Sequence, residues 1–136
     1  MPKICEMLLK LEGFKYSNSM DLNVGYYHIC ISEESRNLCT IILPWVKYLY
    51  KLLPMEVNNS PDIFQEKTNK MFRGFEFFQA YIYNLLKITK GDFSDHLGEL
   101  KLTLQNLKDN DLKCNIESSF FGQTEMEYLG FWVTCN

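Results

Sequence analysis

Residues 77–89, FFQAYIYNLLKIT, carry the clearest structural signal in this sequence. Two runs within them, 77–82 and 85–89, are rich in aromatic and branched apolar residues and are typical of β-strands. Only Tyr83 and Asn84 separate the two runs, which is the length of a tight hairpin connection. The stretch therefore predicts an antiparallel β-hairpin that turns at Tyr83 and Asn84.

Helical patterns lie on both sides of this hairpin. Residues 61–73 start with Pro61 at the first helical position, and Ser60 is the predicted N-cap. Residues 92–108 give the most regular helical pattern in the chain. The apolar face of this second helix is predicted to consist of Leu97, Leu100, Leu104 and Leu107. Its solvent face is predicted to carry Glu99, Lys101, Gln105 and Lys108.

The remaining elements complete an α+β layout. Residues 2–11 space their apolar side chains as a helix does, and residues 14–21 lead toward a strand. Further strands are predicted at 26–32, 38–42, 47–52, 112–116 and 126–134. The order of helix, strands, helix, hairpin, helix and strands predicts one domain over residues 1–136, with sheet and helices in packed layers.

Composition limits the classes of protein and of partner. The chain has 136 residues, 46% of them hydrophobic and 15% aromatic, which is enough to fold without metals or disulfides. The net charge is −3 and Arg occurs only at Arg36 and Arg73, which argues against strong nonspecific binding of nucleic acid. No apolar run of about 18 residues is present, so we expect no membrane partner.

The five cysteines favour a reducing environment. Their count is odd, their spacing is wide and no CxxC pair occurs, so neither a zinc site nor a disulfide framework is indicated. The sequence predicts free thiols in a soluble protein of the cytoplasm or nucleus.

Several stretches occur in an order that one family shares. They are SMDLNVGYYHICIS (19–32), LPMEVNNSPDIFQ (53–65), AYIYNLLKIT (80–89) followed by DHL (95–97), and EYLGFWVT (127–134). In order and spacing they resemble the palm motifs of reverse transcriptases of gypsy-type LTR retrotransposons, and residues 43–67 are the most specific part. The resemblance implies a right-hand polymerase palm, an antiparallel sheet backed by helices, with part of the fingers. It also implies a partial domain, without the thumb, connection and RNase H regions.

The resemblance further implies an RNA-directed DNA polymerase that uses two Mg²⁺ ions in its active members. Three carboxylates hold such a metal pair, one from the first motif and two from the hairpin turn. Asp21 matches the first, whereas Tyr83 and Asn84 occupy the positions of the other two. A phenol is neutral near pH 7 and an amide offers only a neutral carbonyl, whereas Mg²⁺ prefers charged oxygens. We therefore expect no bound cofactor and no catalysis in this copy.

Other positions depart from the family pattern in the same direction. Glu56 stands where the family has a glycine beside the incoming nucleotide, and Ser118 stands where it has a lysine that protonates the leaving pyrophosphate. Val46 and Asp111 also replace glycines. Losses at metal, substrate and proton-donor positions together predict a pseudoenzyme.

The resemblance also assigns candidate site residues. Asp21 is the residual catalytic and metal-binding candidate, with a surface aspartate at a strand end as the alternative. Tyr26, Met55 and Gln65 are the substrate-binding candidates. For Tyr26 the alternative is core packing, and for Gln65 it is a solvated helix face.

A few residues outside the motifs have two interpretations each. Asp92 and Asp95 are either replacement carboxylates or, as we favour, residues that stabilise a helix N-terminus. His96 is expected to be structural. The lysines at 47, 51, 67 and 70 suit a small basic face or an ordinary solvated one.

Exposed aromatic side chains suggest a surface for association. Without neighbouring domains, a palm is expected to leave the following residues partly open: Trp45, Tyr48, Phe75, Phe77, Phe78 and Trp132. Self-association or a protein partner is therefore an expectation, besides the RNA or DNA template–primer of active relatives.

Three functions follow from the sequence. The first is an inactive reverse-transcriptase-like domain from a retroelement polyprotein. The second is a repurposed palm that binds protein or nucleic acid. The third is a weakly active subunit that borrows carboxylates from elsewhere.

Overall fold

The computed structural model describes residues 3–22, 29–54 and 57–135. Its helices are α1 (Ile4–Leu9), α2 (Glu33–Arg36), α3 (Ser60–Met71) and α4 (Phe93–Asp109). Its strands are β1 (Tyr16–Leu22), β2 (Thr40–Ile42), β3 (Lys47–Leu49), β4 (Phe78–Tyr81), β5 (Asn84–Thr89), β6 (Cys114–Gln123), β7 (Glu125–Tyr128) and β8 (Phe131–Thr134). No helix in these residues has the length and apolarity that crossing a membrane requires.

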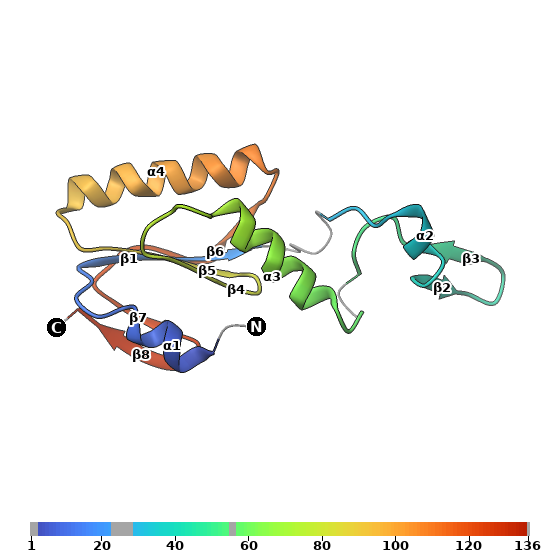
Figure 1. Ribbon diagram of the computed structural model, residues 1–136, viewed down its shortest axis with the longest axis horizontal. Helices are drawn as coiled ribbons and strands as arrows, with labels where there is room; N and C mark the ends of the chain where they lie inside the picture. The colour runs from blue at the N-terminus through green and yellow to red at the C-terminus, as the bar shows by residue number, and fades with distance from the viewer. Residues whose placement is uncertain (1–2, 23–28, 55–56, 136) are drawn as a thin grey trace.

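An antiparallel sheet of four strands, in the order β4-β5-β1-β6, forms the centre of the molecule (Figure 1). Helices α3 and α4 cover one face, and α1 with the β7–β8 hairpin covers the other. Each face has its own apolar cluster. The predicted α+β class and the antiparallel sheet backed by helices are confirmed.

Strand β5 lies in the middle of this core because its side chains alternate between the two faces. Leu85 packs with Phe64 of α3, whereas Leu86 and Ile88 pack with α1 and β7. Leu85 and Leu86 have no exposed surface. Each such burial contributes about 1.5–3 kcal/mol, so β5 holds both layers in place.

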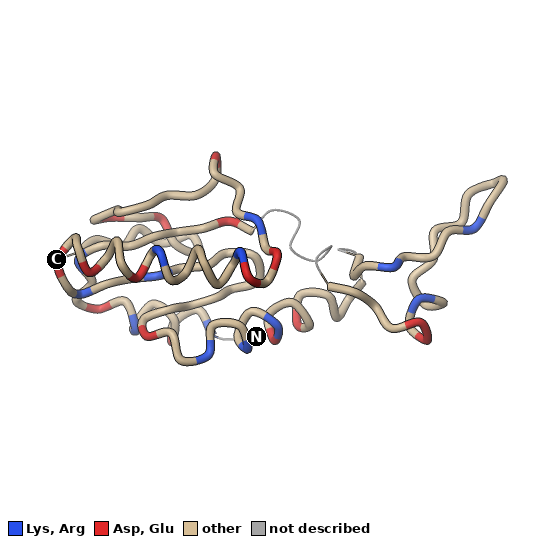
Figure 2. The backbone as a smooth tube through the Cα atoms, turned by 90° about the horizontal axis from the view of Figure 1, so that it is seen from above, with Lys and Arg blue, Asp and Glu red and all other residues tan. Residues whose placement is uncertain are grey.

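Helix α2 and the β2–β3 hairpin project away from this body (Figures 1 and 2). Trp45 is 77% exposed and Tyr48 is 55% exposed there. Phe77 and Trp132 are also exposed, whereas Phe75 and Phe78 are half-buried beside Phe72. The expected exposed aromatic side chains are therefore present on the β2–β3 hairpin, at Trp45 and Tyr48, and also at Phe77 and Trp132.

Two predictions, one in the first motif and one in the second, require correction. Part of the expected strand 26–32 lies outside the described residues, and residues 29–32 contribute only an isolated bridge between Cys30 and Leu52. Ser32 instead caps α2, whose Ser35 N–H it accepts. Ser60 is not an N-cap, because its hydroxyl donates to the carbonyl oxygen of Pro54 at 2.6 Å.

The C-terminal strands also differ from the prediction. Strand β6 starts at Cys114 and is far longer than the predicted 112–116. The predicted strand 126–134 is a hairpin, because Leu129 and Gly130 take φ angles of 52° and 81°. Positive φ at both central residues is the geometry of a two-residue hairpin turn, and leucine there concealed it from the sequence pattern.

The inner face of α4 is polar, contrary to the prediction. Leu97 and Leu104 are 49% and 41% exposed, whereas His96 and Thr103 are fully buried. Of the four leucines predicted to face inward, only Leu107 is fully buried. A buried hydrogen-bond network fixes this orientation of the helix.

The network centres on Asn18 of β1. Its Oδ1 accepts the Gly122 backbone N–H at 2.9 Å, which identifies this oxygen as an acceptor for His96 Nε2, also at 2.9 Å. His96 Nε2 therefore carries the proton, and Nδ1 accepts the Thr89 hydroxyl at 2.7 Å. The network ties α4 to β1, β5 and β6, and the expected structural role of His96 is confirmed.

The side chain of Gln65, on α3, is also buried, at 4% exposure. Its Nε2 donates to the carbonyl oxygen of Ala80 at 2.6 Å and to Asn69 Oδ1 at 3.1 Å. Its Oε1 accepts the Ile82 N–H at 2.7 Å. The solvated-face interpretation of Gln65 is wrong, because its side chain joins α3 to the β4–β5 turn.

The first prediction concerns pH. Burial, the largest effect, lowers the pKa of His96 below its usual 6.5, Glu99 opposes this and Lys87 adds to it. The unfolded chain therefore binds the proton more readily, and the free energy of unfolding should fall as the pH drops below about 6.5. Urea unfolding at pH 7.5, 6.5 and 5.5 measures this.

The control for this prediction is the second histidine. His96→Gln should remove the pH dependence between pH 7.5 and 5.5, whereas His28→Gln should retain it. If His28→Gln removed the pH dependence and His96→Gln retained it, His28 would be the titrating group and the prediction would be wrong.

The second prediction concerns the Gln65 contacts. Gln65→Leu leaves the Ala80 carbonyl and the Ile82 N–H unpaired, so it should lower the free energy of unfolding by about 2–3 kcal/mol. Gln105→Leu, at an exposed position, should change it by no more than about 0.5 kcal/mol. Equal effects of the two substitutions in chemical denaturation would show that the buried contacts contribute nothing.

Candidate functional site

The register of the sheet brings the candidate catalytic positions together at one end of the central strands, beside the β4–β5 turn. This end is called the edge below. Asp21, at the end of β1, lies opposite Asn84 of β5 and opposite Asn115 of β6. Tyr83 lies in the adjoining turn, 43% exposed, and its carbonyl oxygen accepts the Leu22 N–H at 2.8 Å. The structure thus brings Asp21, Tyr83 and Asn84 together, as the motifs predict.

The turn itself differs by one residue from the prediction. It consists of Ile82 and Tyr83, and Asn84 is already the first residue of β5. Ile82 takes a φ of 54°, a conformation that β-branched residues avoid. Gln65 from α3 and Leu22 from β1 hold the turn from two sides, which stabilises this strained backbone.

The donors at this edge do not suit a pair of divalent metal ions. Asp21 supplies one carboxylate, and Asn84 and Asn115 supply neutral amides. Within the described residues, no group of three or more His, Cys, Asp or Glu side chains is placed to hold a metal. The metal pair implied by the family therefore does not fit this set of ligands.

Cys114 does not replace a missing carboxylate. It pairs with Leu22 in the sheet, next to Asp21. Burial, and then the negative charge of Asp21, raises the pKa of the Cys114 thiol. Metal ions bind the thiolate, so this neutral thiol is a poor ligand. All five cysteines are free, as predicted.

The β6 side of the site is irregular. The pairing of β6 with β1 shifts register twice, on either side of Ser19. In the irregular stretch, Ser119 Oγ accepts the Asp21 N–H at 3.1 Å, and the exposed Ser118 accepts a hydrogen bond from Asn115. A serine hydroxyl does not release its proton near pH 7 as a lysine ammonium can, so Ser118 provides no general acid there.

The other sequence candidates are distributed as follows. Tyr26, Met55 and Glu56 lie outside the described residues. Asp92 is the N-cap of α4, and its Oδ1 accepts the Asp95 N–H at 2.9 Å, which confirms the capping interpretation. Asp111 takes a φ of 56°, which explains why a glycine suits that position.

The predicted basic face is partly neutralised. Lys70 pairs with Glu66 on α3 at 2.6 Å, and both side chains are exposed. The hydrogen bond from Lys70, followed by its charge, lowers the pKa of Glu66. Such an exposed pair contributes little to stability.

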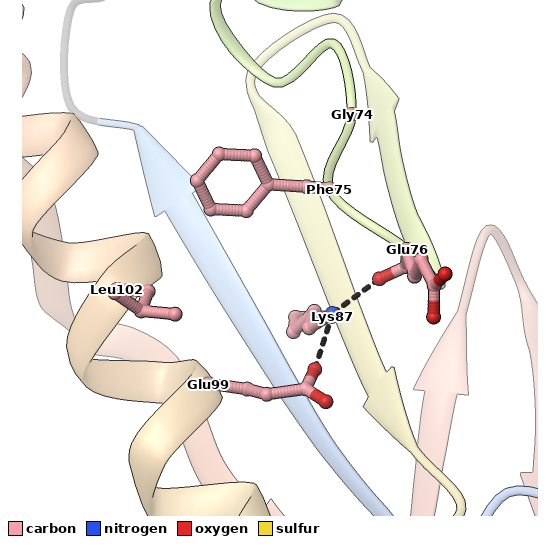
Figure 3. A pocket seen from close by; sticks show the side chains of 6 residues that line it. All are labelled: Gly74, Phe75, Glu76, Lys87, Glu99 and Leu102. Atoms are coloured by element: carbon pink, nitrogen blue, oxygen red, sulfur yellow. Dashed lines mark hydrogen bonds and ion pairs between the residues drawn. The ribbon is translucent and has the colours of Figure 1, made fainter.

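A buried lysine was not predicted. Lys87 of β5 is 3% exposed, pairs with Glu99 Oε2 of α4 at 2.5 Å and donates to the Glu76 carbonyl oxygen (Figure 3). These residues line a pocket of about 280 Å³ with Gly74, Phe75 and Leu102. The sequence signal was a lysine inside an otherwise apolar strand, with a glutamate on the following helix. Lys87 lies three residues from Asn84, about 10 Å along the strand, so it is not part of the Asp21 site.

Comparison with known proteins agrees with this geometry. Residues 2–133 match the family model described as reverse transcriptase (RNA-dependent DNA polymerase). The enzymatic polyprotein of Soybean chlorotic mottle virus is 28% identical over all of this chain. The retrovirus-related Pol polyproteins from the transposons opus and gypsy of Drosophila melanogaster are each 29% identical, over 100% and 98% of the chain. The chain spans 20%, 14% and 13% of these relatives.

Solved structures share the fold. The foamy viral protease-reverse transcriptase in complex with an RNA/DNA hybrid superimposes with a TM-score of 0.90 over 98% of this chain, which is 18% of that protein, at 21% identity. The native Prototype Foamy Virus protein gives a TM-score of 0.83 over 92% of this chain and 17% of its own, at 25% identity. The match of the family model over nearly the whole sequence, together with the palm architecture, shows that the chain belongs to the reverse transcriptase family.

Proposed function

We propose that this chain is a reverse transcriptase palm that does not catalyse nucleotide transfer. One observation carries the proposal: the β1–β5 register places Asn84, and not a carboxylate, opposite Asp21. The neighbouring turn position carries Tyr83, a phenol. The scaffold that would hold three carboxylates is therefore formed, but it presents only one.

The chemistry of the family explains why one carboxylate is not enough. Two cations about 3.5–4 Å apart must activate the primer hydroxyl and stabilise the leaving phosphate. Such closely spaced charges need several anionic ligands. Asp21 with two neutral amides supplies a single negative charge, and the Cys114 thiol stays protonated.

Template–primer nucleic acid is one candidate partner. Similar structures were solved with an RNA/DNA hybrid and with double-stranded DNA. In this chain, the net charge of −3 disfavours nonspecific attraction to phosphates. Binding, if retained, would depend on local contacts. We also propose an intracellular location, in the cytoplasm or nucleus, and the free thiols support it because they suit a reducing compartment.

A second candidate function is a binding module built on the palm. The favouring observation is that two buried polar side chains, Gln65 and His96, keep their hydrogen-bond partners around a changed catalytic site. Gln65 has partners for both its amide oxygen and its nitrogen, and His96 has partners for both ring nitrogens. A palm that keeps a well-formed core without its carboxylates suits a role in binding.

The third prediction is a primer-extension result. The folded protein should give no incorporation above that of Asp21→Ala, on an RNA or a DNA template, with Mg²⁺ or Mn²⁺. Asp109→Ala is the matched control, because it removes an exposed carboxylate that is not one of the candidate metal ligands. Incorporation by the parent and by Asp109→Ala that Asp21→Ala abolishes would contradict the proposal. A folded but inactive sample would leave the binding role.

A further inference from the structure

The outer surface of α4 carries an apolar stripe that no helix or strand of the described residues covers. Leu97, Leu100 and Leu104 follow one another at helical spacing, and Leu97 and Leu104 are 49% and 41% exposed. In Figure 1, α4 lies on the outside of the sheet, with no element above it. The three leucines are called the leucine stripe below.

The stripe faces outward because polar contacts fix the rotation of the helix. His96 bonds to β1 and β5, and Asn106 Nδ2 donates to the Met71 carbonyl oxygen at 2.8 Å. Glu99 pairs with the buried Lys87 (Figure 3). Turning the leucines inward would break all of these contacts and leave buried polar groups unpaired, which is costly. Exposure of the stripe is therefore a fixed property of the fold.

The charges beside the stripe are positive. Lys101, Gln105 and Lys108 lie with the three leucines on one open face of α4. No acidic side chain of the described residues belongs to this set. The Asp109 carboxylate accepts a hydrogen bond from Gln105 at 2.8 Å, and Glu99 is held on the opposite flank by Lys87. An apolar stripe bordered by lysines is complementary to an apolar stripe bordered by carboxylates.

We propose that the leucine stripe with Lys101 and Lys108 docks an amphipathic helix whose apolar face is flanked by acidic residues. Side-chain ridges of a partner helix pack between those of α4, and opposite charges beside an apolar seam select the partner. None of these residues is among the metal positions, so docking does not depend on whether the palm is catalytic.

A second copy of this chain fits the stripe poorly. Pairing α4 with its own copy would bring lysines near lysines, which is unfavourable. Any occupant binds weakly, because a stable interface buries about 800 Å² per partner and three half-exposed leucines offer far less apolar area. The expected contact is therefore a weak one with an acidic helix of another protein.

The fourth prediction tests this docking with two synthetic peptides. Each has about three heptads with leucine at a and d, and carries either glutamate or lysine at e and g. Fluorescence anisotropy of the labelled peptides with the whole chain should show saturable binding of the acidic peptide. The basic peptide should bind about tenfold more weakly, because it faces like charges.

Variants of the chain locate the contact. Leu104→Ser should weaken binding of the acidic peptide about tenfold, since it removes an apolar anchor. Lys101→Glu combined with Lys108→Glu should reverse the preference toward the basic peptide. Leu102→Ser is the matched control: Leu102 is 63% exposed on the other flank of the same helix and should leave binding unchanged. All these positions are exposed, and circular dichroism checks that the variants fold.

Several outcomes would overturn the proposal. Equal binding of both peptides, or no binding of the acidic one, would remove the charge argument. Equal weakening by Leu102→Ser and Leu104→Ser would remove the assignment to the stripe. Sedimentation of the unliganded chain as a dimer that Leu104→Ser dissociates would identify a second copy as the occupant instead.

Discussion

The pairing of β1 with β5 is the constraint on which the rest of the structure depends. Six consecutive residue pairs, from Tyr16 with Thr89 to Asp21 with Asn84, set the alignment of the two central strands. A slip of one residue would turn every side chain of β5 to the other face and break both apolar clusters. The same alignment places residue 84 opposite Asp21, so the identity of the residue at 84 determines which chemical groups meet there.

Buried polar contacts make this scaffold independent of the catalytic carboxylates. Gln65 holds the β4–β5 turn from α3, and His96 holds α4 against three strands through Asn18 and Thr89. None of these contacts involves Asp21, Tyr83 or Asn84. These contacts therefore stay in place whatever residues stand at 21, 83 and 84, which is consistent with the proposal of a palm that keeps its fold without the ligands of a metal pair.

The sequence predicted the α+β palm and the meeting of Asp21 with residues 83 and 84, because motif order and strand periodicity carry that information. It failed where tertiary contacts override local pattern. Leu97 and Leu104 looked like core residues, but the hydrogen bonds of His96 turn them outward. Gln65 looked equally suited to solvent, since nothing local indicates that its amide reaches a hairpin turn 15–17 residues further along the chain.

A Mn²⁺ titration monitored by electron paramagnetic resonance tests most directly whether residues 21, 83 and 84 can hold metal. It compares the folded parent, Asp21→Ala and the double variant Tyr83→Asp with Asn84→Asp. The parent should show no saturable site up to about 1 mM Mn²⁺ and should not differ from Asp21→Ala, whereas the double variant should bind saturably, because three carboxylates then lie together. Saturable binding by the parent that Asp21→Ala abolishes would contradict the proposed loss of metal binding, because the present ligands would then suffice to hold metal.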